Sequence, residues 1–176
     1  MTVSQRLIRA FVRALLVFCF ACASANVVAT RSPCPVTPIT RVYVMIEQRT
    51  FEASFTRALG AALCREFETQ GVAANFRALN GLSSDERDAF EQARQWQADA
   101  RLTLDFAGGM ASVTSFSTVV FSADLFHRGA PKPVWHARVQ SEEGSFGSTQ
   151  GMIDDAARSL VDRLQSDGWL DVRHRT

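Results

Sequence analysis

Residues 41–47, Arg-Val-Tyr-Val-Met-Ile-Glu, decide the fold of this 176-residue chain. Apolar side chains occupy both alternating sets of positions in this run, which is typical of a central strand covered on both faces. The next segment, 51–69, predicts a helix capped by Thr50 and ended by Gly71. Its apolar stripe at helical spacing consists of Phe51, Phe55, Leu59, Ala62 and Leu63. A strand followed by such a helix predicts the first crossover unit of an α/β protein.

The remaining elements continue this alternation. They are expected as a strand over 72–78, a helix over 83–98, a strand over 102–106, a strand within 112–126, a strand over 134–139 and a helix over 152–164. Ser83 and Glu86 form a capping box, and Gly108-Gly109 predicts a hairpin turn. The order β-α-β-α-β-β-β-α predicts a single three-layer α/β (α+β) domain over residues 41–176. Its mixed five-stranded sheet is expected in the order 2-1-3-4-5, with strand 4 alone antiparallel.

The first 25 residues have the pattern of a secretory signal peptide. Three arginines and no acid precede an apolar run at 14–21, and Ala23-Ser24-Ala25 supplies small residues before a cleavage site at Asn26. The apolar run is too short to cross a bilayer. Lipidation of Cys22, as in bacterial lipoproteins, is a second interpretation, in which Cys19 stands where such signals carry Leu. The chain is therefore expected to be exported, and to be periplasmic or held at the outer membrane through Cys22.

Residues 26–40 are rich in proline and predict an extended lead-in without helix. After cleavage only Cys34 and Cys64 remain, and in an oxidising compartment they form a candidate disulfide that would join the lead-in to the first helix. The alternative is a free Cys34 and a Cys64 thiol buried among alanine and leucine.

Charge and motif content argue against several classes of function. Loss of the leader arginines turns the formal net charge of +1 slightly negative. A nucleic-acid-binding domain instead carries a basic surface on which Lys and Arg are clustered. His127, His136 and His174 are the only histidines and do not have the spacing of metal ligands. No nucleotide-binding glycine motif or Gly-x-Ser-x-Gly elbow occurs. We therefore assign no catalytic residue, metal ligand or cofactor.

Large apolar residues in the last two strands offer a candidate partner surface. Phe121 and Trp135 are the candidates for an apolar edge or groove that receives a partner strand. Packing in the hydrophobic core is the competing interpretation.

A family resemblance covers roughly residues 41–168 and is carried by the segments RVYVMIE, FEASFTRALGAALCREFETQG, VWHARVQ and MIDDAARSLVDRLQSDGW. Together they resemble small exported envelope domains of the TolB amino-terminal type and the related outer-membrane lipoprotein domains of the CsgG and penicillin-binding-protein-activator kind. The resemblance implies binding to envelope proteins or lipoproteins and no catalytic site.

The leading hypothesis is thus a non-enzymatic periplasmic or outer-membrane-associated interaction module for envelope assembly or transport. A small exported hydrolase with a dispersed site is one alternative. The other is a lipid or small-ligand carrier, which needs an apolar cavity of at least about 300 Å³.

Overall fold

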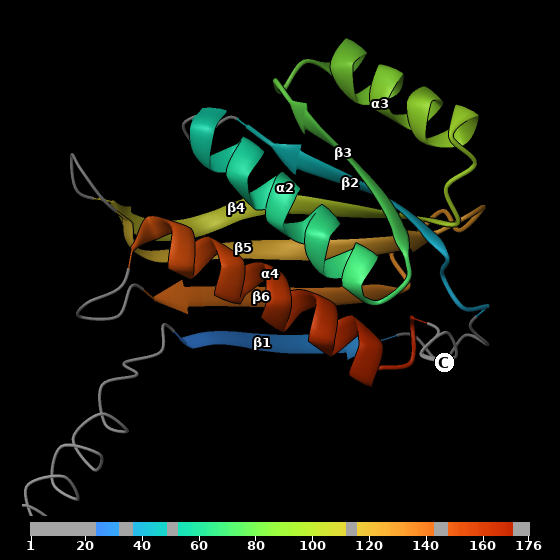
Figure 1. Cartoon of the computed structure of the whole chain (residues 1–176). Coiled ribbons are helices and arrows are strands. Elements are labelled where there is room, and N and C mark those ends of the chain that lie inside the picture. Colours follow the sequence, from blue (N-terminus) through green and yellow to red (C-terminus); the bar gives the residue numbers. More distant parts are fainter. Residues whose placement is uncertain (1–23, 32–36, 49–52, 112–115, 143–147, 171–176) are drawn as a thin grey trace, which may run out of the picture.

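A computed structural model of the protein describes residues 24–31, 37–48, 53–111, 116–142 and 148–170 (Figure 1). The strands are β1 (Ser24–Arg31), β2 (Arg41–Glu47), β3 (Ala73–Leu79), β4 (Ala100–Ala111), β5 (Phe116–His127) and β6 (Trp135–Glu142). The helices are α2 (Ala53–Thr69), α3 (Ser83–Gln95) and α4 (Thr149–Ser166).

All six strands form one mixed sheet in the order β1-β6-β5-β4-β2-β3. Strand β2 is parallel to β3 and β4, whereas the β4–β5, β5–β6 and β1–β6 pairs are antiparallel. The predicted α/β class with a mixed sheet is confirmed. The order 2-1-3-4-5 is wrong for the sheet as a whole, because β1 adds a sixth strand beside β6; the five expected strands keep their neighbours.

Strand β1 spans the last two residues of the expected leader and the first part of the segment expected as an extended lead-in without helix. It runs antiparallel to β6 over its whole length, from Ser24 opposite Glu142 to Arg31 opposite Trp135. Side chains alternate along it, with Val27 packed against the core and Val28 exposed, as expected for an edge strand with one buried face. The expected cleavage site before Asn26 falls inside this strand.

Helices cover the two faces of the sheet unequally (Figure 1). Helices α2 and α4 pack against each other and against one face, where they close the main core. On the opposite face α3 packs over β2 and β3, where Tyr43, Met45 and Leu79 form a second, smaller core with Ala89 and Ala93. The apolar residues on both faces of β2 are buried, as expected for a central strand.

Two local predictions are wrong. Helix α3 begins at Ser83 after Leu82, which makes no side-chain capping bond. Asp85 supplies the local bonds instead: its Oδ2 accepts from the Asn80 amide at 2.7 Å, and its Oδ1 pairs with Arg77. The Gly108-Gly109 pair is not a turn, because β4 continues to Ala111 past an irregularity between Phe106 and Gly108.

Candidate functional site

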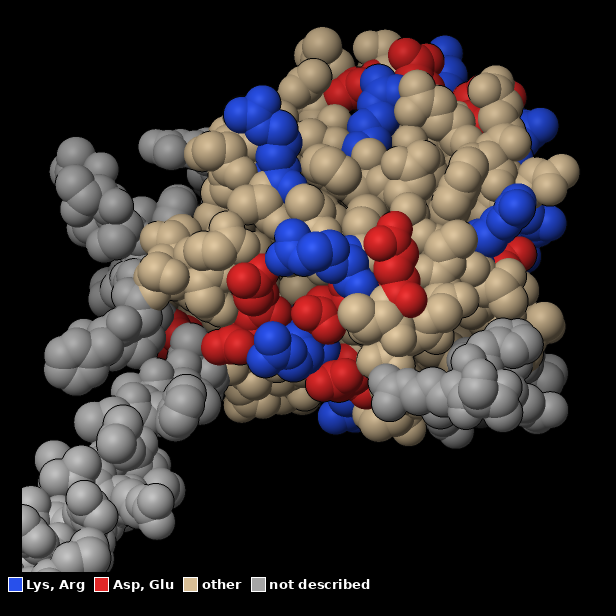
Figure 2. Space-filling model, viewed as in Figure 1, with Lys and Arg blue, Asp and Glu red and all other residues tan. Residues whose placement is uncertain are grey.

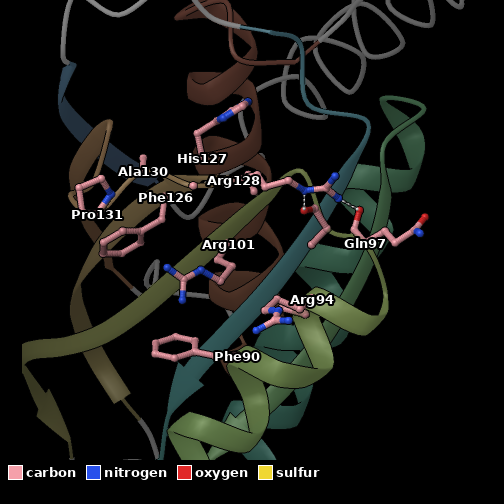
Figure 3. Close-up of a pocket in the computed structure, with 13 residues that line it drawn as sticks. Phe90, Arg94, Gln97, Arg101, Phe126, His127, Arg128, Ala130 and Pro131 are labelled. Atoms are coloured by element: carbon pink, nitrogen blue, oxygen red, sulfur yellow. Dashed lines mark hydrogen bonds between the residues drawn. The ribbon is translucent and has the colours of Figure 1, made fainter.

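A groove of about 590 Å³ lies at the carboxyl-terminal end of α3 (Figure 3). The groove exists because α3 covers only β2 and β3 on its side of the sheet. The beginning of β4 and the end of β5 are therefore left uncovered beside α3. The turn from β5 to β6 closes the far side. The groove is lined by Phe90, Ala93, Arg94, Gln97, Ala98, Ala100, Arg101, Phe126, His127, Arg128, Gly129, Ala130 and Pro131.

Arg101 of β4 lies between two aromatic rings in the groove (Figure 3). Its Cζ is 4.2 Å from the centre of the Phe90 ring of α3 and 5.2 Å from that of Phe126 on β5. Burial lowers the pKa of Arg101 and the charge of Glu86 opposes this, so the guanidinium is partly desolvated. Arg101 forms no salt bridge within the described part of the chain, and cation–π contacts are its main stabilisation there.

Arg128 builds the adjoining wall. Its Nε donates to the carbonyl oxygen of Ala98 at 3.0 Å and its Nη2 to that of Gln97, as the dashed lines in Figure 3 show. Gln97 has a positive φ of 57°, which a non-glycine residue seldom adopts. The two bonds therefore fix the tight turn that joins α3 to β4.

Asp99 secures the same turn from the side of β2. Its Oδ2 accepts hydrogen bonds from the Thr40 hydroxyl at 2.7 Å and from the Thr40 and Arg41 amides at 3.0 Å. Burial raises the pKa of Asp99, but these bonds and the charge of Arg128 outweigh it and leave the pKa below its usual value. The carboxylate is thus held ionised as a connector between β2 and β4.

The open part of the sheet, over β4, β5, β6 and β1, carries polar side chains, including a serine, a histidine and two aspartates. The Asp124 carboxylate lies 2.8 Å from Nδ1 of His136 on the neighbouring strand. Ser122 is on the same face, but its hydroxyl donates to the Asp105 carbonyl at 3.4 Å. A nucleophile needs a hydrogen bond to its base, and the structure does not bring Ser122 and His136 together in this way.

Further acidic side chains lie near the Asp124–His136 pair. Burial raises the pKa of Asp105, and the nearby Glu47 and Asp124 raise it further. Within the described ranges there is no group of three or more His, Cys, Asp or Glu side chains that would hold a metal ion.

The residues expected at a partner surface are in the core. Trp135 is 1% exposed and Phe121 2% exposed, both among the residues under α2 and α4. Of the histidines, His127 lines the groove, His136 lies on the open face, and His174 is outside the described residues.

The predicted cysteine chemistry stays a prediction, because Cys22 and Cys34 lie outside the described residues. Cys64 is half-buried on α2, and burial followed by the charge of Glu68 raises the pKa of its thiol. In the described part of the chain, no helix is long and apolar enough to span a bilayer.

The helical face has a different character from the groove. Figure 2 shows acidic and basic side chains interspersed over α2 and α4. Asp154 bonds to Arg65 across the two helices at 2.8 Å, and Asp155 lies 3.3 Å from Arg158. Adjacent carboxylates on α4 thus pair with separate arginines and do not form a site.

Comparison with known proteins gives a likeness of fold. No family model matches the chain, and no curated protein sequence matches it. It is similar to a PelC dodecamer from Paraburkholderia phytofirmans, with 17% identity, a TM-score of 0.57, and coverage of 80% of this chain and 97% of that chain. A variant PelC dodecamer from the same organism gives 18% identity, a TM-score of 0.56, and coverage of 84% and 99%.

The protein XCC0632 from Xanthomonas campestris, of family model DUF330, is 13% identical with a TM-score of 0.40, over 82% of this chain and 90% of that chain. The resemblance to TolB amino-terminal and CsgG domains is nevertheless wrong, because the fold is similar to that of the two PelC structures. Strand order and hydrophobic periodicity alone did not separate the TolB and CsgG domains from the PelC fold.

Proposed function

We propose that this chain is a non-enzymatic, exported module of the bacterial cell envelope that acts by binding proteins, beginning with further copies of itself. The observation that carries the proposal is strand β1, which forms the edge of the sheet and pairs only with β6 among the described strands. An edge strand of eight residues presents a row of backbone donors and acceptors to a second chain. The similar PelC proteins are dodecamers, which supports assembly of several copies.

The two edges of the sheet differ in a way that favours β1. At the other edge, on β3, the Phe76 amide donates to the side-chain oxygen of Asn75 at 2.8 Å, so this outer group is already bonded. Strand β1 contains neither lysine nor proline, the residues that commonly blunt an edge. Its Val28 is 64% exposed, the kind of apolar group that an interface covers.

The start of β1 also supports attachment through Cys22. Cleavage before Asn26 would remove Ser24 and Ala25, which pair with Glu142 and Ser141 in the sheet. Processing at Cys22 would leave the whole strand on the mature protein. We therefore include lipidation of Cys22 in the proposal, with the Ser24 end of β1 nearest the membrane and the groove at the opposite end of the sheet, about 25 Å away along the strand.

The competing hydrolase hypothesis has weaker support. It requires a hydroxyl or thiol bonded to a base, whereas the Ser122 hydroxyl bonds to a backbone carbonyl and burial raises the pKa of the Cys64 thiol. The carrier hypothesis gains from the groove, whose volume of about 590 Å³ would hold a small molecule.

Light scattering on the mature protein, purified after export, tests self-assembly. The wild type is expected as a species of several copies, and Val28→Lys is expected to weaken association by at least about tenfold, because a charge would be buried at the interface. Ala61→Lys places the same charge on the exposed side of α2 and should leave the mass unchanged. A monomeric wild type, or equal masses for wild type and Val28→Lys, would contradict assembly through β1.

A further inference from the structure

We propose that the groove beside α3 is a binding site for a small molecule that carries an anionic group on an apolar body. This inference goes beyond the proposed function and does not depend on self-assembly. It rests on the charge of the groove, the geometry of Arg101, the apolar walls and the rigidity of the turn.

The groove is basic. Three arginines line it, Arg94, Arg101 and Arg128, and no acidic residue is among its lining residues. Two of the three have an acid beside them, since Arg94 lies 3.6 Å from Glu91 and Arg128 lies 3.9 Å from Asp99. Among the described residues Arg101 has no acid within salt-bridge distance and is influenced by the more distant charge of Glu86, so it is the cation with capacity for a ligand.

The aromatic contacts orient Arg101 for an anion. Phe90 and Phe126 lie over the guanidinium, and among the described residues its N–H groups have no hydrogen-bond partner. These donors are arranged to bind two oxygens of a carboxylate, sulfonate or phosphate at once. Partial burial strengthens such a bond, because water screens it less.

The remaining lining accounts for the apolar part of the ligand. Ala93, Ala98, Ala130 and Pro131 supply small apolar walls beside the two phenylalanine rings. A volume of about 590 Å³ falls in the range of sites that take a single small molecule. A bare inorganic anion would leave these walls uncovered, and a neutral apolar molecule would leave Arg101 without an anionic partner.

The site is held in shape without ligand. Arg128 bonds the carbonyls of Gln97 and Ala98, and Asp99 bonds Thr40 and Arg41, so both sides of the α3–β4 turn are fixed. A preformed site loses less entropy on binding, which favours affinity for a small ligand.

Two fluorescent probes of nearly the same shape test the proposal on the mature protein. 8-Anilinonaphthalene-1-sulfonate carries the anionic group, and N-phenyl-1-naphthylamine is the same ring system without it. The anionic probe is expected to bind at least about tenfold more tightly, as a charge-assisted bond implies. Amide shifts in NMR spectra should concentrate at Ala98, Arg101 and Ala130.

Variants assign the effect to Arg101. Arg101→Gln should lower the affinity for the anionic probe by at least about tenfold and change the affinity for the neutral probe by less than about twofold. Arg101→Lys, which keeps the charge without the planar pair of donors, should show an intermediate loss and guards against a folding artefact. Arg87→Gln makes the same charge change on α3 outside the groove and should have no effect. Equal affinity for the two probes, or equal binding by wild type and a folded Arg101→Gln protein, would overturn the proposal, as would shifts confined to β1.

Discussion

The indole Nε1 of Trp135 donates a hydrogen bond to Oδ2 of Asp167 at 2.8 Å and thereby ties the start of β6 to the end of α4. Asp167 is the residue that follows the last turn of α4, and the same oxygen accepts from Nε of Arg163 at 3.0 Å. Trp135 is almost fully buried, so the indole N–H, the one polar group of its side chain, needs this partner. A residue that the sequence offered as a partner surface is instead a connection within the core.

Removal of the Asp167 carboxylate should destabilise the protein. Asp167→Ala leaves the Trp135 donor buried without its partner, and we expect a loss of about 1–3 kcal/mol in the free energy of unfolding. Asp162→Ala on the exposed side of α4 is the matched control and should cost less than about 0.5 kcal/mol. Urea unfolding followed by circular dichroism measures both, and equal midpoints would contradict the role of this bond.

Gly60 should not tolerate even a methyl group. A Cβ built there would overlap the ring of Phe76, because α2 packs closely against β3 at this point. Gly60→Ala is expected to cost about 1–3 kcal/mol of stability despite the better helix propensity of alanine. Gly151→Ala on α4 meets only the Ser148 hydroxyl at 3.6 Å and should lie within about 0.5 kcal/mol of wild type. Thermal unfolding of the two variants compares them directly, and similar melting temperatures would refute the close packing.

Asp99 should make the protein sensitive to acid. Its pKa is lower when folded than when unfolded, so its contribution is complete at pH values above the usual carboxyl pKa of about 4 and is lost as the pH falls through the lower folded value. Asp99→Asn should therefore lose about 2 kcal/mol at pH 7 and progressively less than that in acid. Asp88→Asn, an exposed carboxylate on α3, is the control. A stability difference that did not depend on pH would argue against the ionised carboxylate.

Asp105 should behave in the opposite way. Its pKa is raised on folding, so the folded protein holds this proton more tightly and loses stability as the pH rises through the range above about 4. Asp105→Asn removes the cost of burying the charge and the repulsion from Glu47, and should gain about 0.5–1 kcal/mol at pH 7, with no gain at pH 3. Chemical denaturation across this pH range is the measurement. If Asp105→Asn were less stable than wild type at pH 7, the Asp105 carboxylate would be stabilising the fold, which contradicts the prediction.

Apolar periodicity predicted most of the fold. The run 41–47 is a buried central strand, and the apolar stripe of α4 lies against the sheet, because burial of these side chains selects the same period that the sequence displays. Strand β1 was missed because its alternation is short and lies between a leader and a proline-rich segment. The hairpin turn predicted at Gly108-Gly109 was wrong because glycine also fits an irregular position within a strand.

The groove was beyond reach of sequence alone. Arg101 and Phe126 lie on the polar sides of their strands, and only the antiparallel register places them opposite each other. Phe90 joins them from a helix whose position depends on the second core around Tyr43 and Met45. An arginine that alternates with Leu102 in a strand gives no signal for aromatic neighbours; their contact is a property of the assembled sheet.

Mass spectrometry of the amino terminus of the mature protein is the decisive measurement for export and for attachment through Cys22. We expect a chain that begins at a lipid-modified Cys22 and keeps the whole of β1. A chain that begins at Asn26 would contradict attachment through Cys22. A cytosolic protein that retains Met1 and its leader would contradict export, and with it the envelope function.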